Sequence, residues 1–172
     1  YDDYKAGKVD EEAMCGEMVT IHAGVREEEI FAAARRFFET VVAPRIFPEM
    51  QQLTHRLAES GCRLWAVSST NEWVIRASAS HFGFPADRVL AASVAVENGH
   101  ATGRLIRVPT DEGKAAAVRE LIGDSVDAAF GNSVHDAAML ELARYAFAVN
   151  PNPDFSPLAV RRGWTVYRPD PL

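Results

Sequence analysis

The chain has 172 residues, 48% of them hydrophobic, so it can bury one substantial core with room for a small appended module. Its formal net charge of −6 and the lack of any Lys or Arg run argue against nucleic-acid binding through general electrostatics. No apolar span is long enough to predict a membrane partner. Cys15 and Cys62 form no metal-type pair and no signal-peptide pattern is visible, so we expect small thiols in a cytoplasmic protein.

The first part of the chain is predicted to be helical. Over residues 9–42 apolar side chains recur at helical spacing, among them Ile30, Ala34 and Phe38. The acidic run at residues 27–29 falls in the first turn of a helix, where carboxylates complement the helix dipole. We therefore interpret this run as a capping feature and not as a catalytic one.

A boundary follows this helical part. Pro44 and Pro48 interrupt the helical pattern, and the rhythm of the sequence changes after them. We therefore expect a small α-helical region over residues 1–46 and a larger core over residues 47–172.

The larger region alternates between helix and strand patterns. Strands are predicted at residues 63–67, 89–96, 102–108, 127–130, 145–149 and 165–167, and helices at residues 48–61, 72–83, 113–122 and 134–143. Asn98 and Gly99 between two of the strands are typical of a hairpin turn. Such alternation predicts an α/β fold with a doubly wound, mostly parallel sheet and helices on both faces.

Polar residues gather where the predicted strands end. In a doubly wound sheet, ligands bind beyond the carboxyl ends of the strands, so these residues should meet in one crevice. They are Ser68, Ser69, Thr70, Asn71, Asn132, Ser133, Asp136 and Asn150.

The chemistry of these residues suits phosphoryl transfer. The Ser68 hydroxyl, followed by the backbone N–H groups of a helix start, is a receptor for a phosphate oxygen. Lys114 near the start of a later helix supplies positive charge. Asn132 and Asp136 are four residues apart, so a turn between them can direct both oxygens at one hard cation such as Mg²⁺.

Each residue also has a plainer interpretation. Ser68 is suited to capping the following helix, Lys114 to being a solvated lysine, and Asp136 to complementing a helix dipole. The order and location of the three along the chain favour the joint site.

That order resembles the haloacid dehalogenase superfamily of phosphohydrolases, most closely the branch with phosphoserine and phosphorylcholine phosphatases. Its second motif, an apolar strand ending in Ser or Thr, is matched by residues 64–68, and its third, a lysine opening a later helix, by Lys114. The fourth motif is matched by residues 128–136, except that Asn132 replaces the first acid.

Two further segments extend the resemblance over nearly the whole chain. Residues 98–104 look like the Gly-x-x-Thr-Gly hairpin common in this branch, and residues 150–153 look like its usual continuation after the fourth motif.

The resemblance implies a Rossmann-like core with a small α-helical cap, Mg²⁺ as cofactor, and hydrolysis of a small phosphorylated metabolite through an aspartyl-phosphate. Ser68 and Lys114 would act catalytically on the phosphoryl group, with Ser69, Thr70 and Asn71 also binding phosphate; Asn132 and Asp136 would position the metal. The helical region would be the cap that shields the site. His135 occupies a variable position of the fourth motif, and we favour a surface or supporting role for it.

Two departures qualify the resemblance. The first motif, a strand followed by Asp-x-Asp that supplies the nucleophile, has no match: Asp2 and Asp3 are adjacent and follow no strand. We therefore expect a fragment lacking its N-terminal portion, with an exposed apolar groove at the sheet centre that favours a homo-oligomer. The second departure is Asn132, whose neutral amide should lower the affinity for Mg²⁺.

Other classes of function stay open at this point. A non-catalytic relative that binds a phosphorylated ligand or a protein partner is the main alternative. A dinucleotide-binding protein is less favoured, because no Gly-x-Gly-x-x-Gly turn follows any predicted strand.

Overall fold

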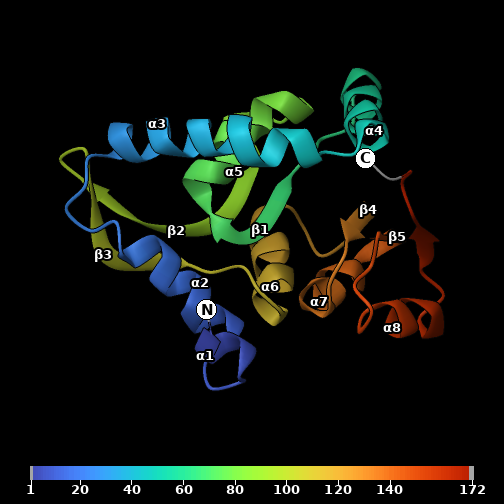
Figure 1. The fold of residues 1–172 in the computed structure, drawn as a ribbon. Coiled ribbons are helices and arrows are strands. Elements are labelled where there is room, and N and C mark those ends of the chain that lie inside the picture. The colour runs from blue at the N-terminus through green and yellow to red at the C-terminus, as the bar shows by residue number, and fades with distance from the viewer. Residues whose placement is uncertain (1, 171–172) are drawn as a thin grey trace. The chain divides into compact units, whose positions relative to one another are not determined.

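The computed structural model describes residues 2–170 (Figure 1). The helices are α1 Asp2–Lys5, α2 Glu11–Thr20, α3 Glu27–Phe37, α4 Pro48–Glu59, α5 Glu72–Ala79, α6 Glu112–Leu121, α7 Ala137–Leu140 and α8 Ser156–Arg161. The strands are β1 Ala66–Asn71, β2 Val89–Glu97, β3 His100–Arg107, β4 Val126–Gly131, β5 Ala143–Val149 and β6 Thr165–Tyr167. Short segments are the π-helical η1 Phe38–Val42 and the 3₁₀ turns η2 Ala43–Arg45, η3 Ser80–Phe82, η4 Ala86–Arg88 and η5 Val134–Asp136.

The chain divides into two compact units, with the division between Pro109 and Thr110. The first unit contains a three-stranded sheet in the order β1-β2-β3, and the second contains a three-stranded sheet in the order β4-β5-β6. Only the β2–β3 pairing is antiparallel among the described strands, so the predicted mostly parallel α/β architecture is confirmed. The predicted boundary between residues 46 and 47 stays a prediction.

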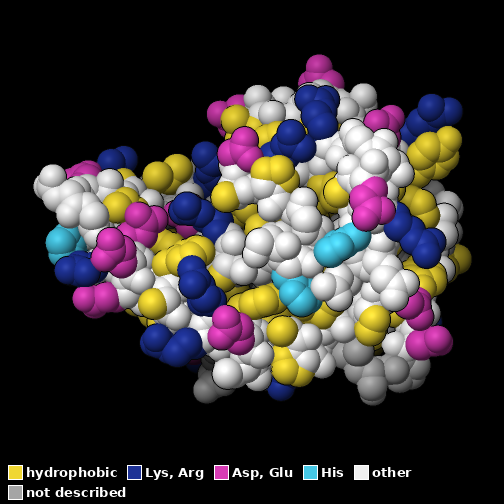
Figure 2. Space-filling view, turned by 90° about the horizontal axis from the view of Figure 1, so that it is seen from above, with side chains coloured by type: hydrophobic (Ala, Val, Ile, Leu, Met, Phe, Trp, Pro, Cys, Tyr) yellow, Lys and Arg dark blue, Asp and Glu magenta, His cyan; other side chains and the backbone are white. Residues whose placement is uncertain are grey.

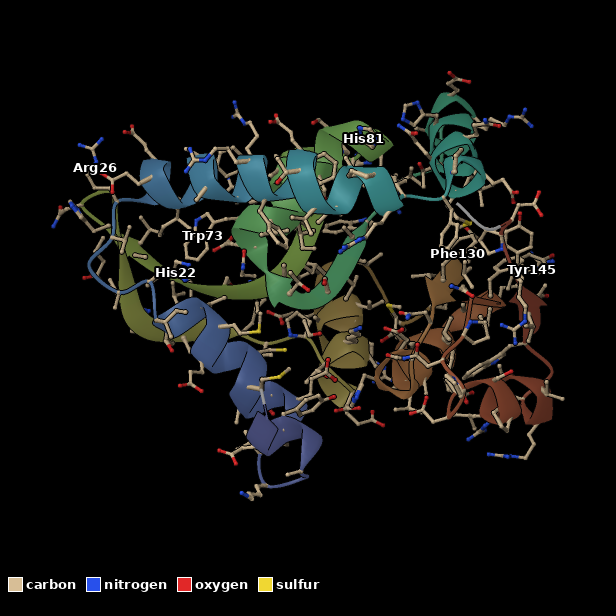
Figure 3. All side chains as sticks on the ribbon, viewed as in Figure 1. His22, Arg26, Trp73, His81, Phe130 and Tyr145 are labelled. Carbon is tan, nitrogen blue, oxygen red and sulfur yellow. The ribbon has the colours of Figure 1, made fainter. Side chains whose placement is uncertain are left out.

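In the first unit, α5 packs along α3 on one side and against β2 on the other (Figure 1). Trp73 on α5 is fully buried beneath α3, and its ring lies 5.4 Å from that of His22 (Figure 3). Helix α3 carries acidic residues in its first turn and basic residues in its last, as its dipole favours. The core of this unit consists of Val19, Ile30, Ala34, Trp73, Ala92, Val94 and Ala101.

The second unit places β5, which contains the strand predicted at residues 145–149, in the middle of its sheet. Phe130 on β4 and Phe147 on β5 are paired neighbours whose rings stack at 4.8 Å. The core residues are Ala129, Leu140, Ala148, Phe155 and Ala159.

The hairpin predicted at Asn98 and Gly99 is present between β2 and β3. Both residues have positive φ angles, 50° and 75°, which two-residue hairpin loops require for their twist to match that of the strands.

Two predicted elements differ from the structure. The strand predicted at residues 63–67 is found further along the chain, as β1. Its pairing with β2 begins at Ala66, opposite Val89, and continues past an irregularity to Asn71. Residues 68–71 therefore belong to the strand and do not follow it. The helix predicted at residues 134–143 is a 3₁₀ turn followed by the short α7, because the chain must enter β5 at Ala143.

Charged side chains of both signs are interspersed on the face seen from above (Figure 2). Such mixing does not create the single-sign field that attracts a polyanion. Within residues 2–170, no helix combines the length and the apolar composition that crossing a bilayer requires.

Candidate active site

A buried ion pair joins two of the predicted site residues. Lys114 lies in the first turn of α6, and its Nζ donates to Oδ1 of Asp136 at the end of η5, 22 residues later. The two side chains are only 8% and 7% exposed. A buried charge needs such a partner, since an unpaired one costs several kcal/mol.

The second oxygen of Asp136 organises the turn after β4. Its Oδ2 accepts the backbone N–H groups of Asn132 at 2.8 Å and Ser133 at 3.0 Å. Ser133 caps η5 in return, so the two residues form a reciprocal capping box. The Asp136 carboxylate therefore holds both the turn and Lys114.

Gly131, the last residue of β4, makes room for this carboxylate. A Cβ at Gly131 would lie 2.5 Å from Cβ and 2.9 Å from Oδ2 of Asp136, closer than van der Waals contact permits. Gly131 lies in the stretch matched to the fourth motif, but neither its packing role nor the capping role of Ser133 was predicted from the sequence. The Ser-x-x-Asp spacing of Ser133 and Asp136 is the signal that marks the capping box.

The environment of Asp136 keeps it charged. Burial alone would raise the pKa of Asp136, but the Lys114 ammonium and the N–H groups of Asn132 and Ser133 outweigh it and lower the pKa below its ordinary value. The carboxylate is thus ionised at neutral pH and pairs with Lys114 as a true ion pair.

Asn132 presents its side chain outward. Its backbone N–H is bonded to Asp136 and its backbone carbonyl accepts from the N–H of Asn152 at 2.9 Å, while the side chain is exposed. In the described part of the chain no hydrogen bond engages the Asn132 amide. Amide and carboxylate oxygens are ligand types that Mg²⁺ prefers, and the assignment of Asn132 and Asp136 as metal ligands stays a prediction.

The polar segment at residues 68–71 is organised differently. Asn71 caps α5, its Oδ1 accepting the N–H of Val74 at 3.0 Å, so the capping role considered for Ser68 belongs to Asn71. Ser69 Oγ donates to Glu11 Oε1 at 2.9 Å. Ser68 Oγ accepts the N–H of Thr70 at 3.1 Å, and this leaves the Ser68 hydroxyl proton available to a ligand.

His135 contacts a residue in an unusual conformation. Its Nδ1 lies 2.8 Å from Oδ1 of Asp111, which precedes α6 and has a φ of 48°, in the left-handed region that non-glycine residues rarely adopt. The supporting role favoured for His135 is compatible with this contact and stays a prediction.

The seven predicted site residues are divided between the two units. Ser68, Ser69, Thr70 and Asn71 lie in the first unit, and Lys114, Asn132 and Asp136 lie in the second. Within the second unit the structure brings Lys114, Asp136 and the Asn132 backbone together.

Residues 3–141 match the model of the haloacid dehalogenase-like hydrolase family, which covers most of the chain. The chain therefore belongs to the haloacid dehalogenase-like hydrolase family.

Relatives and solved structures agree with this assignment. The chain is 30% identical to phosphoserine phosphatase SerB1 of Mycobacterium tuberculosis over 145 residues, 80% of this chain and 46% of that protein. It is 25% identical to a histidinol-phosphatase of Neisseria meningitidis over 176 residues, 96% of this chain and 78% of that protein. The chain thus spans about half the length of SerB1 and of several other curated relatives that it matches.

Solved structures show the same fold. A Bordetella pertussis protein of unknown function superposes with a TM-score of 0.85 at 24% identity, over 96% of this chain and 78% of that one. A phosphoserine phosphatase solved as a phospho-aspartyl intermediate analogue superposes with a TM-score of 0.59 at 15% identity, over 97% of this chain and 76% of that one. The predicted Rossmann-like fold of the haloacid dehalogenase type is confirmed by these matches.

Proposed function

We propose that the protein is a Mg²⁺-dependent phosphomonoester hydrolase acting on a small phosphorylated metabolite. The observation that carries the proposal is the buried ion pair between Lys114 on α6 and Asp136 on the turn after β4. This pair occurs in a chain that belongs to a family of hydrolases. The reaction would pass through an aspartyl-phosphate whose nucleophile lies outside these 172 residues, because no Asp-x-Asp after a strand is present among them.

Lys114 would offset the charge of the transferring phosphoryl group. One N–H of its ammonium is used by Asp136, and two remain for phosphate oxygens. Because Asp136 fixes the position of the ammonium, Lys114 need not reorganise during the reaction, which is how a preorganised charge accelerates phosphoryl transfer.

Ser68 and the residues after it, in the first unit, would bind phosphate. The Ser68 hydroxyl has a proton to donate, and the N–H groups at the start of α5 lie a few residues further on. Ser69, Thr70 and Asn71 would shape this receptor.

Asn132 and Asp136 would hold the metal ion. When bound, Mg²⁺ would neutralise negative charge on the phosphate oxygens. The exposed Asn132 amide is the more accessible ligand, since three N–H groups and the Ser133 hydroxyl already face the Asp136 carboxylate.

The relatives support the class of substrate. One is named for phosphoserine and another for histidinol phosphate, both small phosphorylated molecules. We extend this class to the present protein, together with a cytoplasmic location and a cap function for residues 1–46 that shields the site from water.

The test is hydrolysis of p-nitrophenyl phosphate by the purified full-length protein with and without Mg²⁺. We expect Mg²⁺-dependent hydrolysis, and we expect Lys114→Gln to lower kcat/KM by about 10²–10³-fold, as removal of one preorganised donor does. Arg119→Gln, on the exposed side of the same helix, is the matched control and should keep full activity. Full activity of Lys114→Gln would refute the assignment of Lys114, and no hydrolysis of any phosphomonoester would refute the proposed function.

A further inference from the structure

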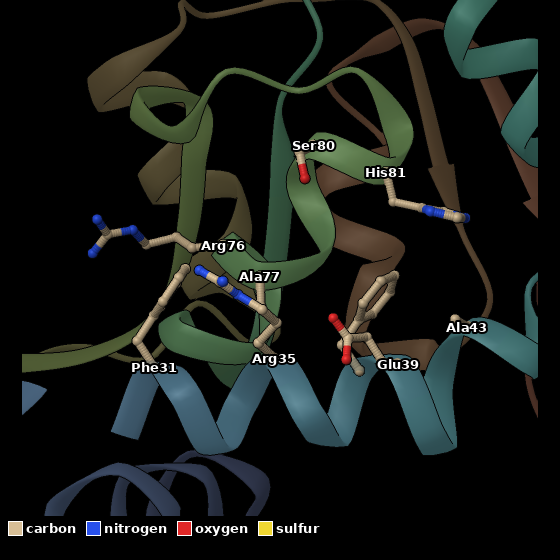
Figure 4. Close-up of a pocket in the computed structure, with 9 residues that line it drawn as sticks. Phe31, Arg35, Glu39, Ala43, Arg76, Ala77, Ser80 and His81 are labelled. Atoms are coloured by element: carbon tan, nitrogen blue, oxygen red, sulfur yellow. The ribbon is translucent and has the colours of Figure 1, made fainter. Parts of the chain in front are cut away.

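A cavity of about 540 Å³ lies between two helical segments of the first unit (Figure 4). Its lining comes from α3, η1 and Ala43 of η2 on one side and from α5 with η3 on the other. Residues 68–71 do not contribute to this lining. The volume is typical of sites for small organic molecules.

One part of the cavity carries two arginines over a single aromatic ring. The guanidinium carbon of Arg35 lies 5.4 Å from the centroid of the Phe31 ring, and that of Arg76 lies 5.9 Å from the same centroid. Each guanidinium is attracted to the face of the Phe31 ring, but the two positive charges repel one another.

Among the described residues, only one of these two cations, Arg76, pairs with a carboxylate. Arg76 Nη1 lies 3.6 Å from Glu27 Oε1, an oxygen that also accepts from Trp73 Nε1 at 3.4 Å. Over residues 2–170 no carboxylate pairs with Arg35, although Glu39 is one helical turn further along. Glu27 and Glu72 both interact electrostatically with Arg76, so Arg35 is the arginine without a partner carboxylate in the described structure, and its single charge matches a monoanion.

The opposite part of the cavity is electrically different. His81 on η3 packs against the Phe38 ring, with centroids 5.4 Å apart. Gln51 Nε2 lies 3.3 Å from the His81 carbonyl and 2.9 Å from His81 Nε2. Because the carbonyl accepts only, the Gln51 amino group faces both atoms, so it donates to His81 Nε2 as well. Glu39 supplies a carboxylate to the lining at this end.

We infer that this cavity binds a small carboxylate with a flat apolar body and a hydrogen-bond donor at its far end. The carboxylate takes the guanidinium groups of Arg35 and Arg76, the body packs on Phe31 and Phe38, and the donor reaches Glu39. Glu39 repels a second anionic group at that end. The inference goes beyond the proposed hydrolase activity and does not depend on it.

Calorimetric titration of the purified full-length protein with matched probes tests this site. The probe is 4-hydroxyphenylacetate; phenylacetate lacks the donor, and 2-(4-hydroxyphenyl)ethanol lacks the charge. We expect saturable binding of the probe, binding of phenylacetate weaker by several-fold, and binding of the alcohol weaker by about tenfold or more, since a charged hydrogen bond is lost. No saturable binding of the probe, or equal binding of the alcohol, would overturn the inference.

Variants locate the binding. Arg35→Gln should lower the affinity for the probe by about tenfold. The melting temperature should stay unchanged, because the Arg35 side chain is exposed and makes no ion pair in the described structure. Arg36→Gln, one residue along the same helix and outside the cavity lining, is the matched control and should bind normally. Unchanged affinity in Arg35→Gln contradicts the site.

A last variant separates this site from the proposed catalytic one. Ser68→Ala should bind the probe as the unmodified protein does, because Ser68 does not line the cavity. Loss of probe binding in Ser68→Ala would place the ligand at the predicted phosphate-binding segment and would overturn the inference while leaving the proposed function standing.

Discussion

The turn at residues 131–136 and the segment at residues 68–71 are both predicted to bind phosphate or metal, yet they are built in opposite ways. The turn is organised around one buried charge, Asp136, which holds a lysine and two backbone N–H groups. The segment contains neutral side chains that bond to nearby backbone or, for Ser69, to Glu11. The charged half of the proposed site is therefore sensitive to single substitutions, and the neutral half is tolerant.

The largest expected effect is that of Asp136→Ala. It leaves the Lys114 ammonium buried without a partner, so we expect a loss of about 3–5 kcal/mol in the free energy of unfolding and loss of phosphatase activity. Urea unfolding and hydrolysis of p-nitrophenyl phosphate measure the two effects. Asp124→Ala, at an exposed loop residue, is the control and should change stability by less than about 0.5 kcal/mol.

A double variant shows whether the charge itself is responsible. Replacing Lys114 by Met and Asp136 by Leu removes both charges, so stability should recover relative to Asp136→Ala while activity stays lost. A double variant as unstable as Asp136→Ala would mean that the hydrogen bonds to the turn, and not the ion pair, dominate.

Gly131→Ala should have the next largest effect. The new Cβ would lie 2.5 Å from Cβ of Asp136, so the turn must shift, at a cost of about 1–3 kcal/mol in thermal or urea unfolding. Gly103→Ala in β3 is a matched control, because its Cβ would meet only the side chain of Ala23 at 4.0 Å. Equal stability of the two variants would contradict the close packing of Asp136 on Gly131.

The charged turn also shows which parts of the candidate site could be predicted from the sequence. Lys114 and Asp136 could be predicted as site residues, because each follows a recognisable strand or opens a helix. Their ion pair could not be predicted, since it joins residues 22 apart that were assigned separate ligands, phosphate and metal. The requirement for Gly131 arises from a contact with a side chain five residues later, which no local pattern reveals.

The parts of the fold that depend on local sequence patterns were predictable. Apolar runs and turn residues identify β2, β3 and their hairpin, because Asn98 and Gly99 carry the positive φ angles themselves. The limits of β1 were not predictable. Its ladder with β2 contains an irregularity between Val67 and Asn71, and such a register change depends on the partner strand.

The pH dependence of stability should follow Asp136. Burial opposes its charge, but Lys114 and the turn N–H groups lower its pKa below the unfolded value. The stabilisation is therefore complete above the unfolded pKa of about 3.9 and is lost as the pH falls through the lower folded pKa. Urea unfolding of the protein and of Asp136→Asn from pH 7 to pH 2 should show a difference in stability that shrinks below about pH 4. A difference that is constant over this range would contradict the lowered pKa.

The smallest expected effects lie in the neutral segment, and they distinguish its structural residues from its proposed catalytic one. Asn71→Ala removes the cap of α5 and should cost about 1 kcal/mol of stability. Ser68→Ala removes only an acceptor for the Thr70 N–H in a partly buried position, so it should cost less, about 0.5–1 kcal/mol, while it lowers hydrolysis of p-nitrophenyl phosphate. If Ser68→Ala destabilises the protein more than Asn71→Ala does, or leaves hydrolysis unchanged, Ser68 is a structural residue and the phosphate must be bound by other groups.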